Sequence, residues 1–252
     1  MVGSVPRVVS LVLSLTEAVA VSLPGVLVGA TDWCDHPGDL DVARMGGTKN
    51  PRTDDIVRLA PDLVIANEEE NREADLTALR EAGVEVLLTE VRDVPGAFAE
   101  LERVLRACGA RSRPRWLDEA ESAWSRPPGA ATDGPLTPGR RTTAVVPVWR
   151  RPWMVLGRDT FAGDVLARLG VDHLYAGHAE RSPRVPVEEL RAAAPDVVVL
   201  PDEPYRFTAD DGPEAFGGLP CALLSGRHLT WYGPSLAEAP RVLDAALRAA
   251  RH

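Results

Sequence analysis

The feature that most constrains the fold is a short pattern that occurs twice in the chain. Residues 56–65 read Ile-Val-Arg-Leu-Ala-Pro-Asp-Leu-Val-Ile, and residues 190–199 read Leu-Arg-Ala-Ala-Ala-Pro-Asp-Val-Val-Val. In each copy the end of a helix runs into a Pro-Asp turn and then into an apolar, β-branched run. Such a run is typical of a strand buried on both faces. The two copies therefore predict two similar halves of mixed α/β structure.

Strands and helices alternate around both copies of the pattern. In the first half we expect strands at 7–13, 26–30, 63–66 and 84–88. We expect helices at 14–22 and 72–82, and a further helix that ends at residue 59. In the second half we expect strands at 143–148, 154–157 and 197–200, and helices at 160–169, 188–193 and 235–250. Ser14 and Glu17 have the spacing of a capping box, which predicts that the first helix begins at Ser14. This alternation predicts parallel sheets covered by helices.

A long helical segment separates the two halves. Apolar side chains follow helical spacing through residues 98–108 and again through 116–124, and Pro114 is expected to break or kink the helix between them. The predicted fold is α/β, with two Rossmann-like lobes that contain parallel sheets and are joined by a long bridging helix. The expected ranges are 1–92 for the first lobe, 93–126 for the bridge, 127–141 for a Pro/Gly-rich connector, and 142–252 for the second lobe.

Charge and cysteine content exclude several classes of protein. The formal net charge of the 252 residues is −9, which argues against nucleic acid as a partner. Cys34, Cys108 and Cys221 lie too far apart for a four-cysteine zinc site or a disulfide framework. No run approaches the ~20 apolar residues of a membrane span. The start lacks the basic residues of a signal peptide, so we expect a cytoplasmic protein as given, or an extracytoplasmic one if the native start lies upstream.

Loops at the carboxyl ends of the predicted strands are the expected place for a ligand, because open α/β sheets bind ligands there. These loops are rich in aromatic rings with a polar edge, which suit a large, partly apolar ligand such as a corrin or a siderophore. The candidate ligand-binding residues are Ser14, Thr16, Trp33, Lys49, Asn67, Trp149, Arg150, Arg151, Trp153, Asp159, Tyr205, Trp231 and Tyr232.

Two clusters in these loops allow more than one interpretation. Arg150 and Arg151 stand between two tryptophans, where a guanidinium can stack on a ring, grip an anionic group of the ligand, or simply be solvated. Cys34 and His36 are candidate ligands of a soft metal, and His36 is a candidate axial ligand to cobalt or haem iron. The alternatives are a loop that merely lines a cleft, or a Cys-His enzyme, although residues two apart rarely aim at each other productively.

Several segments together resemble a known family. They are residues 9–17 (VSLVLSLTE), 46–51 (GGTKNP), 61–67 (PDLVIAN), 149–153 (WRRPW), 157–161 (GRDTF) and 202–205 (DEPY). In this order they resemble the helical-backbone metal receptor superfamily, the class III periplasmic binding proteins, and within it the cobalamin-binding-type branch. That group contains the cobalamin, ferric-siderophore, haem and metal binding proteins of ABC importers.

The resemblance implies a ligand cleft between two lobes, binding without chemical turnover, and no required cofactor. It also implies that one carboxylate of each lobe docks on the membrane permease, and the matching residues here are Glu73 and Glu188. We therefore expect a monomeric solute-binding protein of an ABC importer, which takes a corrinoid such as cobalamin or a ferric siderophore. The alternative is an intracellular corrinoid- or metal-binding sensor that is not coupled to transport.

Overall fold

The structure is a computed structural model that describes residues 5–127, 135–136 and 139–250, so most of the expected connector lies outside the described residues. The chain forms two compact units. The first, which we call the N-terminal lobe, comprises Met1–Val91, Gly96–Asp118 and Tyr232–Pro234. The second, the C-terminal lobe, comprises Arg92–Pro95, Glu119–Trp231 and Ser235–His252. Each lobe has its own sheet and its own apolar core, as the predicted fold class requires.

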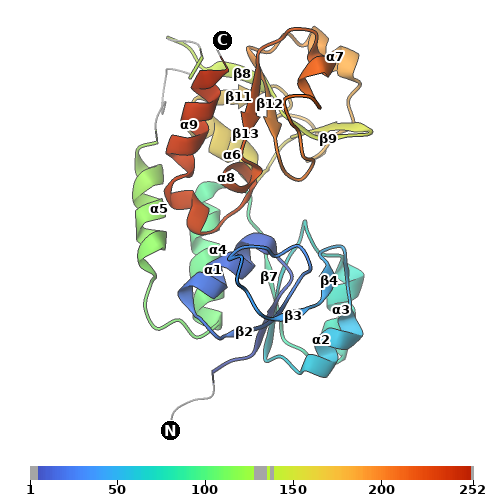
Figure 1. The fold of residues 1–252 in the computed structure, drawn as a ribbon, viewed down its shortest axis with the longest axis vertical. Helices are drawn as coiled ribbons and strands as arrows, with labels where there is room; N and C mark the ends of the chain where they lie inside the picture. The colour runs from blue at the N-terminus through green and yellow to red at the C-terminus, as the bar shows by residue number, and fades with distance from the viewer. Residues whose placement is uncertain (1–4, 128–134, 137–138, 251–252) are drawn as a thin grey trace. The chain divides into compact units, whose positions relative to one another are not determined.

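The N-terminal lobe is built on a parallel sheet with the strand order β3-β2-β1-β6-β7. Helices α2 and α3 cover one face of this sheet, and α1 and α4 lie on the other (Figure 1). A short antiparallel pair, β4 and β5, follows β3. The bounds are β1 Val8–Ser10, α1 Leu13–Ser22, β2 Leu27–Ala30, β3 Ala43–Arg44, β4 Gly46–Gly47, β5 Asn50–Pro51, α2 Thr53–Leu59, β6 Leu63–Asn67, α3 Glu73–Glu81, β7 Val86–Thr89 and α4 Val94–Ala107.

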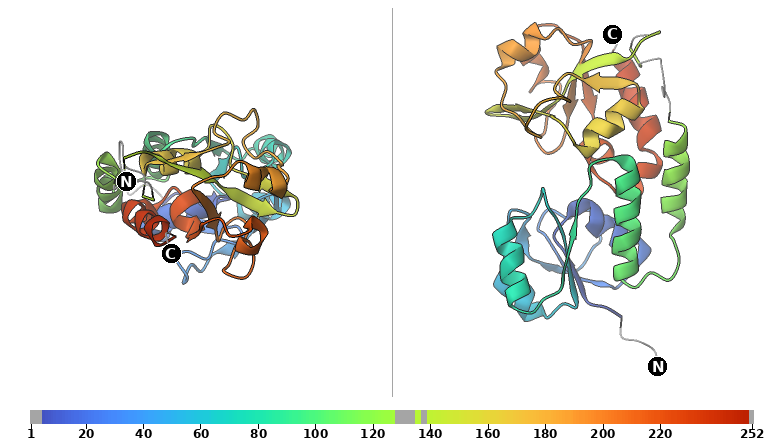
Figure 2. Two further views of the ribbon diagram at one scale, coloured as in Figure 1. Left: turned by 90° about the horizontal axis from the view of Figure 1, so that it is seen from above. Right: turned by 180° about the vertical axis from the view of Figure 1, so that it is seen from behind.

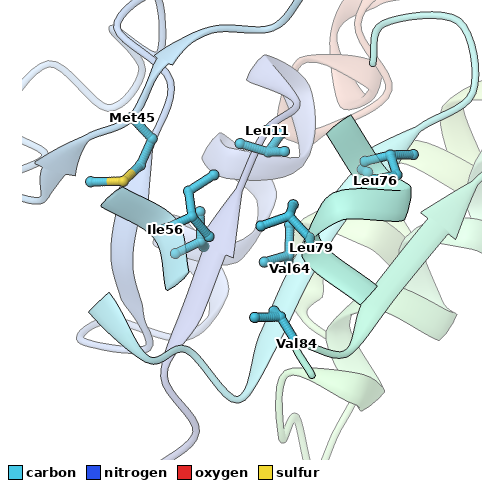
Figure 3. Close-up of a cluster of buried hydrophobic side chains, with 9 residues drawn as sticks. Leu11, Met45, Ile56, Val64, Leu76, Leu79 and Val84 are labelled. Carbon is cyan, nitrogen blue, oxygen red and sulfur yellow. The ribbon is translucent and has the colours of Figure 1, made fainter. Parts of the chain in front are cut away.

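The core of this lobe explains why its strands are apolar on both faces. Alternate residues of the two central strands, such as Val64 of β6, point toward α2 and α3 and meet Ile56 and Leu79 there (Figure 3). The intervening residues, such as Val8 and Ile65, are also fully buried. Since helices cover the sheet from both sides, the central strands β1 and β6 have no exposed face.

The C-terminal lobe repeats the plan with a parallel sheet of order β11-β8-β12-β13. Helices α6, α8 and α9 lie on one face, and α7 packs with η1 on the other (Figures 1 and 2). Strands β9 and β10 form an antiparallel hairpin. The bounds are α5 Arg115–Ser125, β8 Thr142–Val145, β9 Pro147–Arg150, β10 Trp153–Val155, α6 Phe161–Arg168, β11 Val171–His173, α7 Val187–Ala192, β12 Val197–Pro201, η1 Pro213–Phe216, β13 Cys221–Leu224, α8 Gly226–Thr230, η2 Pro234–Ala237 and α9 Ala239–Ala249.

The repeated Ala-Pro-Asp turn has the same conformation in both lobes. Ala60 and Ala194 both have a left-handed backbone with a φ of 47°. The carboxylate of Asp62 accepts a hydrogen bond of 2.8 Å from the backbone amide of Arg7, and that of Asp196 accepts one of 2.7 Å from the amide of Thr143. Asp62 thus links the turn before β6 to the start of β1, and Asp196 links the turn before β12 to the start of β8. The repeat predicted from the sequence is confirmed.

We expect replacement of Asp196 by asparagine to destabilise the C-terminal lobe by about 1–3 kcal/mol at pH 7, because the partly buried amide of Thr143 loses a charged acceptor. A hydrogen bond from Arg140 is the main cause that lowers the pKa of Asp196 to about 2, and Thr143 adds to the effect. Because the folded pKa is lowered, this stabilisation is present above the ordinary value of 3.8 and is lost as the pH falls toward 2. Denaturant unfolding between pH 2 and 7 measures it. Exposed Asp210→Asn is the control, and equal stability of the two variants would contradict the assignment.

Three predicted boundaries are wrong. Helix α1 begins at Leu13 with Val12 as its N-cap, so Ser14 and Glu17 form no capping box. The strand expected to reach residue 148 leaves the sheet after Val145, because the following residues pair with β10 instead. The last helix begins at Ala239, after the separate 3₁₀ turn η2. The predicted break at Pro114 is confirmed, since α4 ends at Ala107 and α5 begins at Arg115.

No helix in the described part of the chain has both the length and the apolar character needed to cross a membrane.

Candidate functional site

The carboxyl edge of the N-terminal sheet carries one large exposed ring. Trp33 follows β2, and 68% of its surface is exposed. Lys49, in the turn between β4 and β5, is also exposed, and its ammonium group donates to the backbone carbonyl of Glu69. An exposed indole and an exposed cation at the same edge provide an apolar plane and a charge for a ligand.

Beneath this edge lies a group of hydrogen-bonded polar side chains that we call the polar floor: Ser14, Asn67, Glu70, Asn71, Thr89 and Tyr232. Tyr232 is 6% exposed, and its phenol is hydrogen-bonded to Ser14 and Thr89. Burial, together with the carboxylates of Glu70 and Glu69, raises the pKa of this phenol well above 10. Tyr232 therefore stays protonated and acts as a neutral partner in the floor.

Asn67 has a structural position in the polar floor. Its side-chain amide donates to the carbonyl and hydroxyl of Thr89, and its side-chain carbonyl accepts from the backbone amide of Glu69. Its backbone amide donates to Asn71, whose own amide reaches the carbonyls of Leu11 and Thr48. These bonds hold the loop after β6 in place, so Asn67 orients its neighbours rather than presenting a free amide.

Glu70 is the titratable group of the polar floor. Desolvation raises its pKa to about 7, opposed by the charge of Lys49 and assisted by that of Glu69, while a hydrogen bond with Tyr232 lowers it. The carboxyl group thus changes charge near neutral pH. Such a group is a common mark of a binding or catalytic site.

We expect Glu70→Gln to remove a pH dependence of stability. Because the folded pKa is raised above its ordinary value of 4.5, the contribution of Glu70 is fully present below pH 4.5 and is lost as the pH rises through 7. The variant should be more stable than the parent at pH 8 by roughly 1–2 kcal/mol, a reduced figure because the side chain is partly exposed. Thermal unfolding at pH 5 and pH 8 measures it. Replacement of exposed Glu68 by glutamine is the control. If Glu70→Gln changes the stability by the same amount at pH 5 and at pH 8, the assigned role of Glu70 is contradicted.

The structure separates Cys34 from His36. Cys34 is 1% exposed, and its sulfur lies 3.0 Å from the hydroxyl of Thr31 and 3.2 Å from that of Thr16. Burial raises the pKa of this thiol, which disfavours the thiolate that a metal or a nucleophilic reaction needs. The imidazole of His36 is 2.8 Å from the carboxylate of Asp35. Within residues 5–127, 135–136 and 139–250, no three His, Cys, Asp or Glu side chains are grouped to hold a metal ion.

Thr16 is fully buried and hydrogen-bonds the carbonyl of Val12, so it too lies inside the N-terminal lobe.

The carboxyl edge of the C-terminal sheet carries a stack of aromatic rings that begins at the surface. Trp149 in β9 is 43% exposed, and its ring stands edge-on to Tyr205 at 5.6 Å. Tyr205 packs on Phe207 at 4.7 Å, and Trp153 lies parallel to Phe207 at 6.0 Å. Trp153 in turn meets buried Phe216 at 5.4 Å. The core therefore supports Trp149 from below and leaves part of its ring for a ligand.

The guanidinium of Arg150 stacks on an aromatic ring of its own lobe and pairs with two carboxylates there. Its guanidinium lies 5.5 Å from the centre of the Trp153 ring and forms ion pairs with Asp211 and Glu214. The side chain is only 17% exposed, so its charge is already neutralised within the lobe. Arg151 is exposed at the turn of the hairpin, where its carbonyl accepts a hydrogen bond from Trp149.

The remaining candidates of this lobe lie near the ends of β12, β13 and β10. Trp231 is 5% exposed and donates to the carboxylate of Glu203 at 2.7 Å, while Tyr205 donates to Asp211 at 2.7 Å. Asp159 has a left-handed φ of 51°, and its carboxylate lies 3.6 Å from the guanidinium of Arg158. A left-handed backbone is uncommon outside glycine, although aspartate tolerates it better than most residues.

The two candidate docking glutamates lie on exposed helical turns. Glu73 opens α3 and pairs with Arg80 at 2.8 Å, and Glu188 lies in the first turn of α7. Their places in the two lobes differ, because α7 precedes β12 as α2 precedes β6. The element that follows β12, as α3 follows β6, is η1, which carries Glu214.

Sequence reasoning missed several of these residues. It did not single out Thr89, which ends β7, or Asn71 and Glu203, which lie in the loops that follow β6 and β12. It did not single out Glu70 either, although burial raises the pKa of this carboxyl group to about 7. Strand ends identify the right loops, but nothing in the sequence indicates which residue of a loop turns inward.

Two parallel α/β sheets, each with an exposed tryptophan at its carboxyl edge, define a two-lobed ligand-binding protein. The particular family follows from comparison with known proteins. The model of the periplasmic binding protein family matches residues 10–215, and the chain belongs to that family. Members of this family bind a solute for transport, so the protein is a substrate-binding protein and not an enzyme, and it requires no cofactor.

Solved structures share the fold over nearly the whole chain. The periplasmic haem-binding protein BhuT, in complex with two haems, is 24% identical with a TM-score of 0.76, covering 98% of this chain and 99% of BhuT. The haem-binding protein RhuT of Roseiflexus sp. RS-1 is 21% identical with a TM-score of 0.78, covering 99% and 100%. The vitamin B12 binding protein BtuF of Vibrio cholerae is 16% identical with a TM-score of 0.70, covering 98% of each chain. No curated protein matches the sequence.

Proposed function

We propose that the protein binds a corrinoid, such as cobalamin, for an ABC-type importer. The single observation that carries the proposal is the pair of tryptophan rings, Trp33 and Trp149, that remain exposed at the carboxyl edges of the two sheets. Large aromatic planes with little conformational freedom suit a large, partly apolar ring system. The solved structures with this fold include two haem-binding proteins and a vitamin B12 binding protein, which supports a macrocyclic metal complex as the ligand class.

The chemistry of the edge residues favours a corrinoid over haem. Haem iron needs an axial ligand from the protein, usually histidine, tyrosine, cysteine or methionine. Here Cys34 and Tyr232 are buried, and the hydroxyl of Tyr205 is bonded to Asp211. Both ring nitrogens of His228 are already hydrogen-bonded. Cobalamin brings axial ligands of its own and needs only contacts to its periphery, so these edges fit it better. His36, in the loop after β2, is 44% exposed and stays a candidate axial ligand.

Titration with cyanocobalamin, haemin and a ferric hydroxamate siderophore tests the proposal. We expect saturable one-to-one binding of the corrinoid at micromolar concentration or below, seen as quenching of tryptophan fluorescence and as heat in calorimetry. Preferred binding of haemin or of the siderophore would overturn the choice of a corrinoid. The absence of saturable binding of all three would overturn the whole ligand class.

We also propose that Glu73 and Glu188 dock on the permease. Both are exposed in the first turns of their helices, where a carboxylate is available to a cationic partner. Alanine at both positions should lower ligand uptake by cells without changing the affinity of the purified protein. Glu188 and Glu73 occupy different places in the repeat, whereas Glu214 follows β12 as Glu73 follows β6. Uptake by a Glu214→Ala variant is therefore compared with uptake by the double variant. Unchanged uptake in the double variant would remove the assignment.

A further inference from the structure

A small pocket lies in the N-terminal lobe, where α4 ends and α5 begins. It has a volume of about 140 Å³ and is lined by residues of both helices and of the loop between them. A Cβ at Gly109, in that loop, would lie 3.5 Å from Pro6, which precedes β1. The pocket is therefore at the amino edge of the sheet, opposite to the edge that carries Trp33 and Lys49, and is separate from the proposed corrinoid contacts.

The turn that ends α4 fixes the backbone on one side of this pocket. Gly109 has a left-handed φ of 96°, and its amide donates a hydrogen bond to the carbonyl of Arg106. The amide of Ala110 donates to the carbonyl of Leu105. These two bonds form a Schellman motif, in which a left-handed glycine closes the helix. Because both carbonyls are already paired, the side chains decide which charge the pocket attracts.

The charged residues of the pocket favour an anion. One carboxylate, that of Glu102, stands against three arginines, and we call the pocket the arginine pocket after them: Arg106, Arg111 and Arg113. This local excess of positive charge occurs in a chain whose formal net charge is −9. Arg113 pairs with Asp118 at 3.0 Å, so the other two arginines supply most of the charge that a ligand meets.

Several hydrogen-bond donors of the arginine pocket are unused. Within the part of the chain that the structure describes, the side chains of Arg111 and Ser112 make no ion pair or hydrogen bond, and both residues are exposed. Arg106 uses its Nη2 for a bond of 2.5 Å to Glu102, and a guanidinium has further N–H donors. A ligand therefore finds free donors at the mouth of the pocket without breaking a contact of the folded protein.

We propose that the arginine pocket binds a phosphate group. The planar guanidinium of Arg111 donates two parallel hydrogen bonds to two phosphate oxygens, and Arg106 and Ser112 donate to the remaining oxygen atoms. A cavity of about 150 Å³ holds benzene, so the pocket has room for one phosphate group and little more. A carboxylate has fewer oxygens and a smaller charge, and it leaves some of these donors unused. The site therefore selects by hydrogen bonding as well as by charge.

Calorimetric titration with inorganic phosphate, and with acetate at the same ionic strength, tests the proposal. We expect saturable one-to-one binding of phosphate at millimolar concentration or below, and binding of acetate that is about tenfold weaker, the effect of one lost charge-assisted hydrogen bond. Sedimentation with vesicles of phosphatidylcholine and phosphatidic acid, against phosphatidylcholine alone, tests a lipid headgroup as the source of the phosphate. Binding of either source supports the site and identifies that source. Binding of neither, or equal affinity for phosphate and acetate, would overturn the proposal.

Variants separate the arginine pocket from general electrostatic attraction. Arg111→Gln should weaken phosphate binding about tenfold and leave thermal unfolding unchanged, because the exposed side chain has no protein contact to lose. Glu102→Gln removes the opposing carboxylate and should strengthen binding about threefold, the effect of releasing Arg106 from an exposed ion pair.

Arg58→Gln is the matched control, because Arg58 is exposed in α2 of the same lobe and does not line the pocket. An equal loss of phosphate affinity in Arg111→Gln and Arg58→Gln, or weaker binding in Glu102→Gln than in the parent protein, would contradict the assignment. Corrinoid affinity should be the same in all three variants and is measured separately, so either proposal can fail without the other.

Discussion

Replacing Phe216 by alanine should lower the free energy of unfolding of the C-terminal lobe by about 3–5 kcal/mol. Phe216 is 1% exposed and is the largest side chain that is fully buried in the described chain. Its ring meets Trp153 edge-on at 5.4 Å within the cluster that joins η1 to β12 and the β9–β10 hairpin. Alanine would leave a cavity that this close-packed cluster fills only in part, and the lost contacts would add to the loss of apolar burial.

Denaturant unfolding followed by tryptophan fluorescence measures the effect, since Trp153 touches the replaced ring. Leu174→Ala is the matched control, because Leu174 is an apolar side chain of the same lobe but is 42% exposed. The control should change stability by less than about 0.5 kcal/mol. A loss below about 1 kcal/mol for Phe216→Ala would show that the aromatic stack does not hold the hairpin in place.

Replacing Trp33 by alanine should weaken binding of the transported ligand by about 10–100-fold while leaving stability nearly unchanged. The indole is 68% exposed, so removing it costs the folded protein little packing. A ligand that covers the ring buries that surface, and alanine cannot replace it.

Val21→Ala is the control for Trp33→Ala. Val21 is 49% exposed in the same lobe, but it lies in the last turn of α1, away from the edge where β1 ends. Affinity is measured by titration with the corrinoid, and stability by thermal unfolding. If both variants bind with the affinity of the parent protein, the exposed ring takes no part in recognition.

Local pattern was sufficient to predict most of the fold. The structure contains the predicted Pro-Asp turns, the strands after them and the break between helices near Pro114. Each of these features is determined by residues that are close together in the chain. The capping box failed for the opposite reason. Ser14 has the right spacing to Glu17, but its hydroxyl is engaged by Tyr232, from the far end of the sequence.

The candidate site was less predictable than the fold. The rule on strand ends selected the right loops, yet Thr16 and Cys34 turn inward while Trp33, from the same edge, stays exposed. Arg150 looked available because Asp211 and Glu214, which neutralise it, come from a loop and a 3₁₀ turn far along the chain.

Tyr232–Pro234 belong to the N-terminal lobe, although the residues on either side of them belong to the other. A ribosome reaches Tyr232 only after it has made both the first part of this lobe and the strands of the other lobe. Nascent domains usually fold in the order in which they emerge, but Ser14 and Thr89 of this lobe lack their partner until a tyrosine that follows the last strand of the other lobe has emerged. A fragment truncated at Asp118 would therefore lack the phenol that completes the polar floor of this lobe.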